Sequence, residues 1–343
     1  MTASDTPLLE RLLRRENLGV AEAAGLLRSL AEENFPPAAA GALLAALRAK
    51  GETAEELRGF AEAMRALARP VALPSGMPAT DVVGTGGDGS GSFNISTGAA
   101  LLAAACGVPV VKHGNRAVSS RSGSADVLER LGVPIASDSG AALACLASCS
   151  FCFLFAPSFH PATRSIAPVR QALGVRTIFN MLGPLSNPAA PPYSLIGAFD
   201  LPTAELLADA LCGMSITRAF VVHGEPGWDE ATPVGPFTLF DVRPGKVERQ
   251  RRDPAAAGIP RCSAAALAGG DATANAAALE AVLRGTDRGA HRDALLLGAG
   301  LVLELTGRAA DLRTGIASAA AALDAGAGGN LLDKLRSFKG AAA

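Results

Sequence analysis

Residues 81–132 read DVVGTGGDGSGSFNISTGAALLAAACGVPVVKHGNRAVSSRSGSADVLERLG. In the first half, an apolar strand leads into the glycine-rich loop 84–89, and a helix of small residues follows to about Gly107. In the second half, a buried strand, 108–111, leads into a polar loop and another helix. Alternation of strands and helices predicts a mostly parallel sheet flanked by helices. The expected fold class is therefore α/β.

The loops of these two units favour a phosphate-rich ligand. Glycines let the backbone adopt positive φ and bring N–H groups close to an anion. A helix that begins near Ser96 adds unpaired N–H groups and the positive end of its dipole. Lys112 follows a parallel strand, where ligands commonly bind in α/β sheets. We therefore expect a large, polyphosphorylated and hydroxyl-rich ligand where the two loops meet.

Two common nucleotide-binding motifs do not explain the first loop. The pattern GxxxxGK[ST] of P-loop proteins is absent from it. Gly84, Gly86 and Gly89 nearly spell the dinucleotide pattern GxGxxG, but Asp88 would set a carboxylate against the pyrophosphate. Alone, this loop could be a purely structural turn. The second polar loop, at the same offset from its own strand, argues against that interpretation.

Composition narrows the classes of partner. The 343 residues favour two domains and carry 31 basic and 32 acidic side chains, for a net charge of −1. Without a basic excess, and with only 4% aromatic residues, no nucleic-acid partner is expected. The uncharged runs 89–111 and 139–163 are interrupted by Gly, Ser, Asn and Pro, so they predict buried strands and helices and no membrane contact. The polar N-terminus shows no targeting segment.

Six cysteines raise the question of a metal cluster. Cys145, Cys149 and Cys152 have a spacing that can hold iron and sulfur. They fall on an Ala-rich helix and an apolar strand, however, which predicts buried small side chains. Nothing in the cysteine pattern requires disulfides, so a cytoplasmic location is expected.

The chain divides into a helical part and an α/β part. Residues 1–70 predict four helices, the last with a capping box at Thr53 and Glu56. A proline-rich linker follows. We expect a small helical domain at 1–74 that also includes about 165–190, and a larger α/β domain at 79–160 and 191–343.

Two further groups of charged residues are candidates for binding a metal ion or a substrate. Asp229 and Glu230 follow a third predicted strand, and adjacent carboxylates there suit Mg²⁺, which binds few protein groups plus substrate phosphates. Arg170 follows Pro168 at an expected helix start, where a guanidinium can clamp a carboxylate. Arg176 is expected to be structural.

These motifs resemble those of the anthranilate phosphoribosyltransferase family. The resemblance is carried by residues 81–132, by APVR at 167–170 and by the acidic pair, and it extends over nearly the whole chain. It implies transfer of the phosphoribosyl group of 5-phosphoribosyl 1-pyrophosphate (PRPP) to the amine of anthranilate, in tryptophan biosynthesis. It also implies Mg²⁺, two ions per subunit, and a homodimer formed through the helical domain.

The resemblance assigns roles to individual residues. The PRPP ligands would be Gly84, Gly87, Asp88, Ser92, Asn94, Ile95, Ser96, Thr97, Lys112, His113, Gly114, Asn115, Arg116, Ala117, Val118, Ser119, Ser120 and Ser124. The anthranilate ligands would be Gly84, Asn115 and Arg170, with His113 beside the acceptor. One magnesium would bind Ser96 and Glu230, and a second Asp229 and Glu230.

Three questions stay open at the level of sequence. The first alternative is a pyrimidine nucleoside phosphorylase, which would use inorganic phosphate. The second is a non-catalytic, nucleic-acid-binding relative of the same fold. The identity of the acceptor is also open. Phe159 and Thr163 differ from the residues most common at these positions in the family, so a substituted anthranilate fits as well.

Overall fold

The computed structural model describes residues 5–117 and 121–339. Within them, the centre is a seven-stranded sheet in the order β3-β2-β1-β4-β5-β6-β7. The first five strands in sequence run parallel, and β6 and β7 form an antiparallel hairpin at one edge. The strands are β1 Thr80–Gly84, β2 Val110–Gly114, β3 Phe151–Phe155, β4 Tyr193–Gly197, β5 Arg218–Gly224, β6 Phe237–Arg243 and β7 Lys246–Arg252. The mostly parallel α/β fold is therefore confirmed.

Three loops that matter for function leave the same edge of this sheet. Parallel pairing places Gly84, the end of β1, beside Gly197, the end of β4. Gly197, the last residue of β4, pairs with Val222, so β5 extends two residues further, to Gly224. β2 runs parallel to β1 on the other side. The glycine-rich loop, the loop after β2 and the loop after β5 therefore share one side of the molecule.

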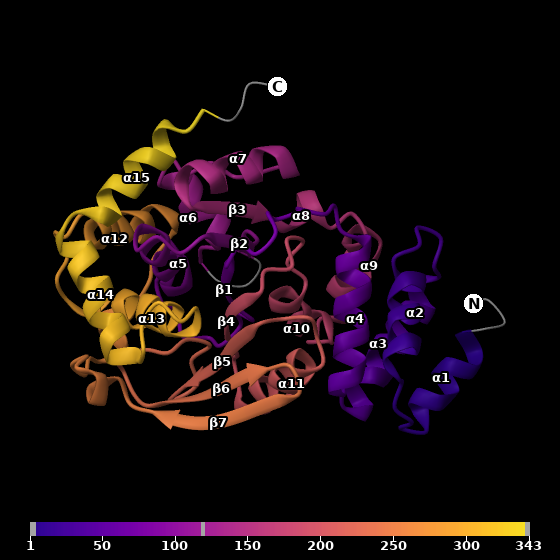
Figure 1. Cartoon of the computed structure of the whole chain (residues 1–343). Coiled ribbons are helices and arrows are strands. Elements are labelled where there is room, and N and C mark those ends of the chain that lie inside the picture. Colours follow the sequence, from indigo (N-terminus) through magenta and orange to yellow (C-terminus); the bar gives the residue numbers. More distant parts are fainter. Residues whose placement is uncertain (1–4, 118–120, 340–343) are drawn as a thin grey trace.

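Helices rich in small residues cover one side of the sheet. Figure 1 shows the C-terminal helices, drawn in yellow and orange, gathered around α5. Every residue of α13 from Ala294 to Glu304 is buried, because this helix packs against both α5 and α14. These helices are α5 Ile95–Ala105, α6 Ser124–Arg130, α7 Ser139–Cys149, α12 Ala272–Leu283, α13 Ala290–Leu305, α14 Leu312–Asp324 and α15 Ala327–Ser337.

The N-terminal helices lie on the opposite side, at the right of Figure 1. The capping box of α4 is confirmed: Thr53 Oγ1 accepts from the N–H of Glu56, and Glu56 accepts from the N–H of Thr53 at 2.9 Å. Helices from the middle of the chain pack here too, with α9 against α3 and α10 against α4. The helices are α1 Asp5–Leu13, α2 Val20–Leu30, α3 Pro37–Lys50, α4 Ala54–Leu67, α8 Ala156–Phe159, α9 Thr163–Leu173, α10 Phe179–Leu182 and α11 Leu201–Cys212.

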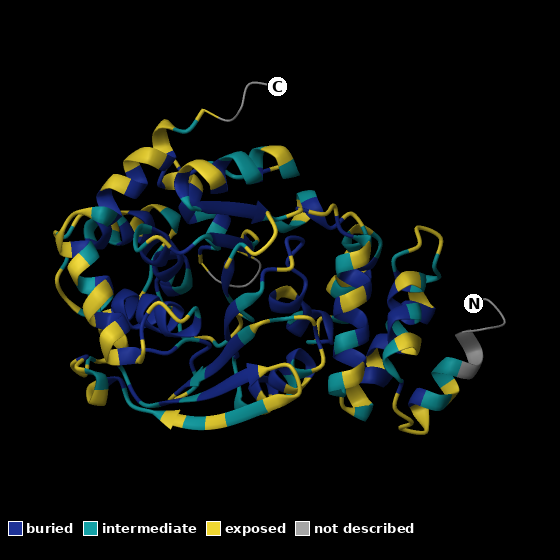
Figure 2. Cartoon of the chain, in the orientation of Figure 1, coloured by how far each residue is buried: buried dark blue, intermediate teal, exposed yellow. Residues whose placement is uncertain are grey.

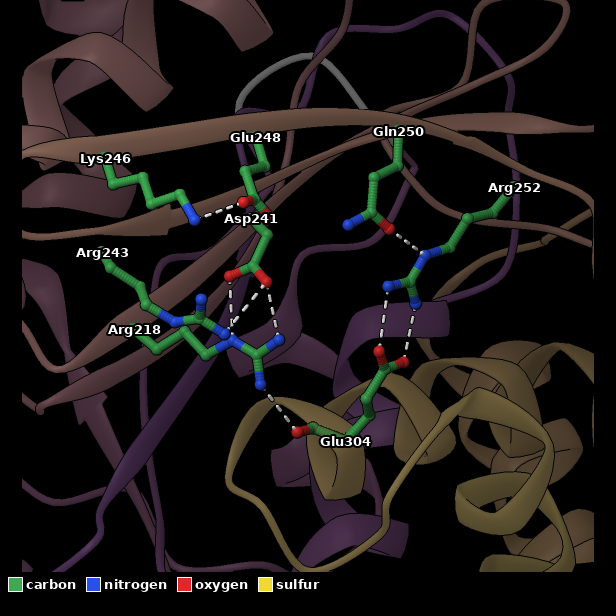
Figure 3. A network of polar contacts seen from close by, with 8 residues as sticks. All are labelled: Arg218, Asp241, Arg243, Lys246, Glu248, Gln250, Arg252 and Glu304. Atoms are coloured by element: carbon green, nitrogen blue, oxygen red, sulfur yellow. Dashed lines mark hydrogen bonds and ion pairs between the residues drawn. The ribbon is translucent and has the colours of Figure 1, made fainter.

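The β6–β7 hairpin is tied to the rest of the fold by arginines. Figure 3 shows Arg218 and Arg252 both reaching Glu304, Arg218 at its carbonyl oxygen and Arg252 at its carboxylate. Arg252 makes two contacts with Glu304 on α13, at 2.6 and 2.9 Å, and Arg218 holds Asp241 in the same bidentate way. This ion pair holds Arg252 in a half-buried position.

Burial follows this layered arrangement. Figure 2 shows the inner strands dark blue and the outer strand β7 largely teal and yellow. Cys145, Cys149 and Cys152 are buried free thiols in the larger core cluster, as expected. Burial raises the pKa of Cys145 to about 12, so it stays a neutral thiol. In 5–117 and 121–339, no helix is both long enough and apolar enough to cross a membrane.

Candidate active site

The glycine-rich loop after β1 is fastened to the acidic pair after β5. Gly86 and Gly87 adopt φ values of 67° and 76°, a conformation that glycine takes up readily. The N–H of Gly86 donates to Asp229 Oδ2 at 2.7 Å, and the N–H of Asp229 donates to Asp88 Oδ2 at 3.2 Å. Two loops that are far apart in sequence therefore form one wall of the site.

The N-terminus of α5 forms a second wall. The helix begins at Ile95, directly after Asn94 and within two residues of the expected start. The N–H of Ser96 donates to Glu230 Oε1 at 3.1 Å, so the acidic pair contacts this helix as well. The hydroxyl of Thr97 is buried without a hydrogen-bond partner among the described residues. Backbone N–H groups and an unpaired hydroxyl at a helix N-terminus suit an anion.

Lys112 connects the two walls. Its side chain is only 2% exposed, and its ammonium donates to the carbonyl oxygen of Val82 and lies 3.4 Å from Ser96 Oγ. Burial lowers the pKa of Lys112, and the carboxylates of Asp81 and Glu230 oppose that shift. A cation is thus held beside the α5 N-terminus and the acidic pair.

The acidic pair carries strongly shifted pKa values. Burial, and next the charge of Asp88, raise the pKa of Asp229 to about 7. Burial, and next the charge of Asp229, raise the pKa of Glu230 to about 8. Carboxylates crowded together in this way repel one another, and a bound cation would relieve the repulsion.

The oxygen atoms of this site fit Mg²⁺. This ion commonly binds one or two carboxylates and completes its shell with substrate phosphates and water. Among the residues that the structure describes, no three His, Cys, Asp or Glu side chains gather into a complete metal site. Ser96, Asp229 and Glu230 would therefore hold magnesium only together with oxygen atoms from a phosphate-bearing substrate.

The loop after β2 is held mainly by contacts with α6. The guanidinium of Arg116 forms ion pairs with Glu129 at 2.6 Å and Asp126 at 3.2 Å. The carbonyl oxygen of Asn115 accepts from Ser124 Oγ at 3.4 Å. Gly84, Ser92, Gly114 and Ala117 lie at the strand ends or in the adjoining loops. Three expected ligands, Val118, Ser119 and Ser120, lie outside the described residues.

His113 lies beside a second histidine that the sequence did not single out. The rings of His113 and His160 are 5.0 Å apart, centroid to centroid. Burial lowers the pKa of His113 to about 3 and that of His160 to about 4, so both rings are neutral at pH 7. Nε2 of His113 and both ring nitrogens of His160 make no hydrogen bond of ordinary geometry among the described residues.

Arg170 is not at a helix start. It lies in the last turn of α9, because Pro168 stands inside this helix and does not begin it. Its guanidinium lies 5.1 Å from the ring centroid of Phe179, and burial lowers its pKa. Within the described part of the chain it forms no ion pair or side-chain hydrogen bond. A half-buried, unpaired guanidinium remains suited to a carboxylate ligand.

Sequence reasoning missed the buried acid Asp81. Its Oδ1 accepts from the N–H of His113 at 3.2 Å, and its Oδ2 accepts from Asn187 Nδ2 at 2.8 Å. Burial raises the pKa of Asp81 to about 6. The available signal was a carboxylate within an apolar strand, where an unpaired charge is costly. Asp81 thereby joins the beginning of β1 to the C-terminal half of β2.

Arg176 also contacts the site, although it was expected to be only structural. Its guanidinium donates to the carbonyl oxygen of Gly87 and lies 4.0 Å from the ring centroid of Phe199. A segment next to the helical part of the chain therefore supports the glycine-rich loop. The arginine-rich stretch signalled a charged contact without identifying its partner.

Two family models match the chain. The helical bundle domain of the glycosyl transferase family matches residues 6–68, and the a/b domain of the glycosyl transferase family matches residues 76–328. Among curated relatives, the anthranilate phosphoribosyltransferase of Desulforudis audaxviator is 46% identical over 330 residues, covering 96% of this chain and 95% of its own.

Solved structures give the same result. The anthranilate phosphoribosyltransferase of Thermus thermophilus is 41% identical with a TM-score of 0.90, and the match covers 96% of this chain and 98% of that one. The Saccharomyces cerevisiae enzyme in complex with PRPP and Mg is 26% identical with a TM-score of 0.88, over 98% and 99%. Its complex with 4-fluoroanthranilate has a TM-score of 0.86 at 26% identity, over 97% of each chain. The chain therefore belongs to the anthranilate phosphoribosyltransferase family.

Proposed function

We propose that the protein transfers the phosphoribosyl group of PRPP to the amine of anthranilate, releasing pyrophosphate, in tryptophan biosynthesis. One observation carries the proposal: Asp229 and Glu230 contact both the glycine-rich loop and the N-terminus of α5, beside Lys112. This arrangement suits a magnesium-bound sugar pyrophosphate. The relatives bear names of the same activity, and the yeast structures contain PRPP with Mg and an anthranilate analogue.

The chemistry is displacement at the anomeric carbon of ribose. The lone pair of the amine forms the new C–N bond, the C–O electron pair leaves with pyrophosphate, and the amine gives up a proton. Such reactions pass through a state resembling an oxocarbenium ion and need positioning more than a strong base. This explains why the site contains oxygen ligands, N–H groups and Lys112 and needs no nucleophilic side chain.

Each group of residues at the PRPP end of the site binds a different part of the substrate. Backbone N–H groups at Gly87 and at the start of α5 bind the pyrophosphate, and Lys112 offsets its charge. The buried, unpaired hydroxyl of Thr97 adds a hydrogen bond. Asn94 and the loop after β2 hold the ribose and its 5-phosphate.

Two magnesium ions per subunit fit the oxygen ligands. Ser96 with Glu230 would bind one ion, and Asp229 with Glu230 the other. Magnesium, when bound, neutralises the pyrophosphate and makes it a better leaving group. The raised pKa values of both carboxylates support binding of cations here.

The acceptor end lies toward α9 and α10. Arg170 pairs with the carboxylate of anthranilate, since its guanidinium lies over the ring of Phe179 and forms no ion pair or side-chain hydrogen bond within the described part of the chain. His113 and His160 are neutral and buried, so they form a weakly polar surface against which an aromatic ring can pack. Asn115 and Gly84 complete the contact with the acceptor.

The molecule is expected to act as a homodimer in the cytoplasm. We expect a helical domain, 1–74 with about 165–190, that forms the dimer contact, and an α/β domain, 79–160 with 191–343. Leu13 on α1 is 62% exposed, which suits an interface there. The six cysteines are free thiols, as a reducing compartment allows. The net charge of −1 supports neither nucleic-acid nor membrane binding.

The test is to incubate the protein with PRPP, Mg²⁺ and a panel of aminobenzoates and to measure pyrophosphate release. Release that depends on anthranilate and on Mg²⁺ is expected, with N-(5-phosphoribosyl)anthranilate as the second product. Absence of release with every aminobenzoate would contradict the proposal. Thymidine or uridine with inorganic phosphate is the control, because phosphorolysis would instead indicate the disfavoured phosphorylase alternative.

A further inference from the structure

Residues 267–269 run beside residues 91–93, which lie between the glycine-rich loop and α5. The N–H of Phe93 donates to the carbonyl oxygen of Leu267 at 3.0 Å, and the N–H of Gly269 donates to that of Gly91 at 2.8 Å. Ser92 and Ala268 form the antiparallel bridge between them. Residues 91–93, which connect the glycine-rich loop to α5, are therefore held by a short antiparallel pairing to a segment more than 170 positions away in sequence.

The close approach depends on glycine. A Cβ atom on Gly269 would lie 2.5 Å from the carbonyl oxygen of Ser92, which is closer than any real contact of this kind. Phe93, whose N–H makes one of these two bonds, is 1% exposed, and its ring centroid lies 4.3 Å from that of His291 on α13. The C-terminal helices thus support the segment that leads into α5.

Asn275, in the first turns of α12, completes this contact. It is 3% exposed, and its Oδ1 accepts from the N–H of Gly270 at 2.7 Å. Its Nδ2 donates to Asn94 Oδ1 at 2.8 Å, and Asn94 Nδ2 donates to the carbonyl oxygen of Ser122 at 3.2 Å. Three hydrogen bonds therefore run in series from α12 through Asn94 to the loop after β2.

The direction of these bonds is fixed at both ends. The backbone N–H of Gly270 can only donate and the backbone carbonyl of Ser122 can only accept, so both side-chain amides have one consistent orientation. Asn94 precedes α5 directly, and its planar amide keeps one hydrogen that no described residue uses. That hydrogen points in a direction set by Asn275.

We propose that Asn275 is a positioning residue for PRPP binding, acting through the orientation of Asn94. This inference rests on the proposed function of the site. Asn275 itself touches no substrate. It sets which way the Asn94 amide faces and ties Asn94 to α12, so its loss weakens PRPP binding and leaves the acceptor side unchanged.

The discriminating variant is Asn275→Asp in the full-length protein. Aspartate has nearly the same shape and still accepts from Gly270, but it cannot donate to Asn94 Oδ1. The Asn94 amide must then turn over, which sets its oxygen against the carbonyl of Ser122. We expect KM for PRPP to rise about 10- to 100-fold, with KM for anthranilate changed less than about twofold.

Asn330→Asp on α15 is the matched control, because it places the same new charge on an exposed position of the C-terminal helices. It should leave both KM values unchanged. Asn275→Ser, which is smaller and uncharged, is measured alongside. Its KM for PRPP should rise as well, since a serine hydroxyl is too short to bridge Gly270 and Asn94.

Calorimetric titration with PRPP and Mg²⁺ gives a second readout that needs no turnover. The Kd for PRPP should rise in parallel with its KM. A folded Asn275→Asp protein with unchanged PRPP binding would overturn the proposal, as would failure of both Asn275 variants to fold, which would make the residue purely structural. An inactive wild-type protein would instead refute the proposed function.

Discussion

Lys112, Asp81 and Asn187 are each at most 2% exposed, yet each has polar atoms matched to partners on neighbouring strands or loops. A buried polar group that loses its partner costs about 1–3 kcal/mol. These residues therefore fix the spacing of the strand ends as well as taking part in the site. The sequence placed Lys112 directly after a strand, whereas it lies within β2, two residues before the end of that strand. Asn187 carried no local signal.

Arg170→Ala tests the acceptor end of the site. We expect KM for anthranilate to rise about 10- to 100-fold, because a hydrogen bond to a charged group contributes about 1.5–3 kcal/mol. KM for PRPP should change little. Steady-state kinetics with each substrate varied in turn make the measurement. Arg164→Ala, exposed on the same helix, is the control, and equal effects on both substrates would rule out the clamp.

Asp229→Asn tests the magnesium ligands. The Mg²⁺ concentration for half-maximal activity should rise at least about tenfold, since even residues that only support a metal ligand are worth about 10- to 100-fold in affinity. Titration of activity with Mg²⁺ at saturating PRPP measures this. Glu225→Gln, exposed in the same loop, is the control. A Mg²⁺ dependence identical to that of the wild type would count against Asp229.

His160 should make stability depend on pH. Its pKa is about 4 in the fold, well below the ordinary value, so on acidification the unfolded chain binds a proton before the folded one does. Stability is then complete above about pH 6.5 and falls as the pH drops toward 4. Between about pH 6.5 and 5, His160 contributes a loss of about 2 kcal/mol.

The comparison that isolates this effect is urea unfolding of wild type and His160→Gln over that pH range. The variant should lose about 2 kcal/mol less than the wild type on acidification. His113, which also faces His160, is present in both proteins and titrates lower still. Parallel stability curves for the two proteins would show that His160 does not titrate as described.

At the scale of elements, local patterns predicted the strands and helices to within a few residues. β2 was expected at 108–111 and occurs at Val110–Gly114, because Pro109 lacks the N–H that a sheet ladder needs. α9 was misplaced for a related reason: Pro168 was expected to begin a helix, but five residues before it are already helical. Proline signals a boundary without showing on which side the helix lies.

The β6–β7 hairpin offers a test at this scale. Arg252 and Glu304 join it to α13 through a bidentate contact, with side chains 19% and 10% exposed. A double-mutant cycle with Arg252→Ala and Glu304→Ala should give a coupling of about 1–2 kcal/mol in urea unfolding.

The exposed pair Arg251 and Glu225, at 67% and 51% exposure, is the reference for this cycle. Its coupling should stay below about 1 kcal/mol, because solvent screens such pairs. Equal couplings for the two pairs would mean that burial does not strengthen the contact to α13.

At the scale of the whole molecule, the site is made of contacts between distant parts of the chain. The pairs Gly86–Asp229, Ser96–Glu230 and Asn94–Asn275 each join loops or helices more than 130 residues apart. The sequence predicted that three strand ends would meet, since parallel strands share one edge. It did not predict which atoms meet, because strand order and helix packing decide that and neither has a local pattern.

A crystal structure of this protein with PRPP and Mg²⁺ tests the central claim most directly. The pyrophosphate should lie between the glycine-rich loop and the N-terminus of α5, within hydrogen-bonding distance of Lys112. Magnesium should contact Glu230, together with Ser96 or Asp229. PRPP bound elsewhere on the chain, or bound here with magnesium away from both Asp229 and Glu230, would contradict the account.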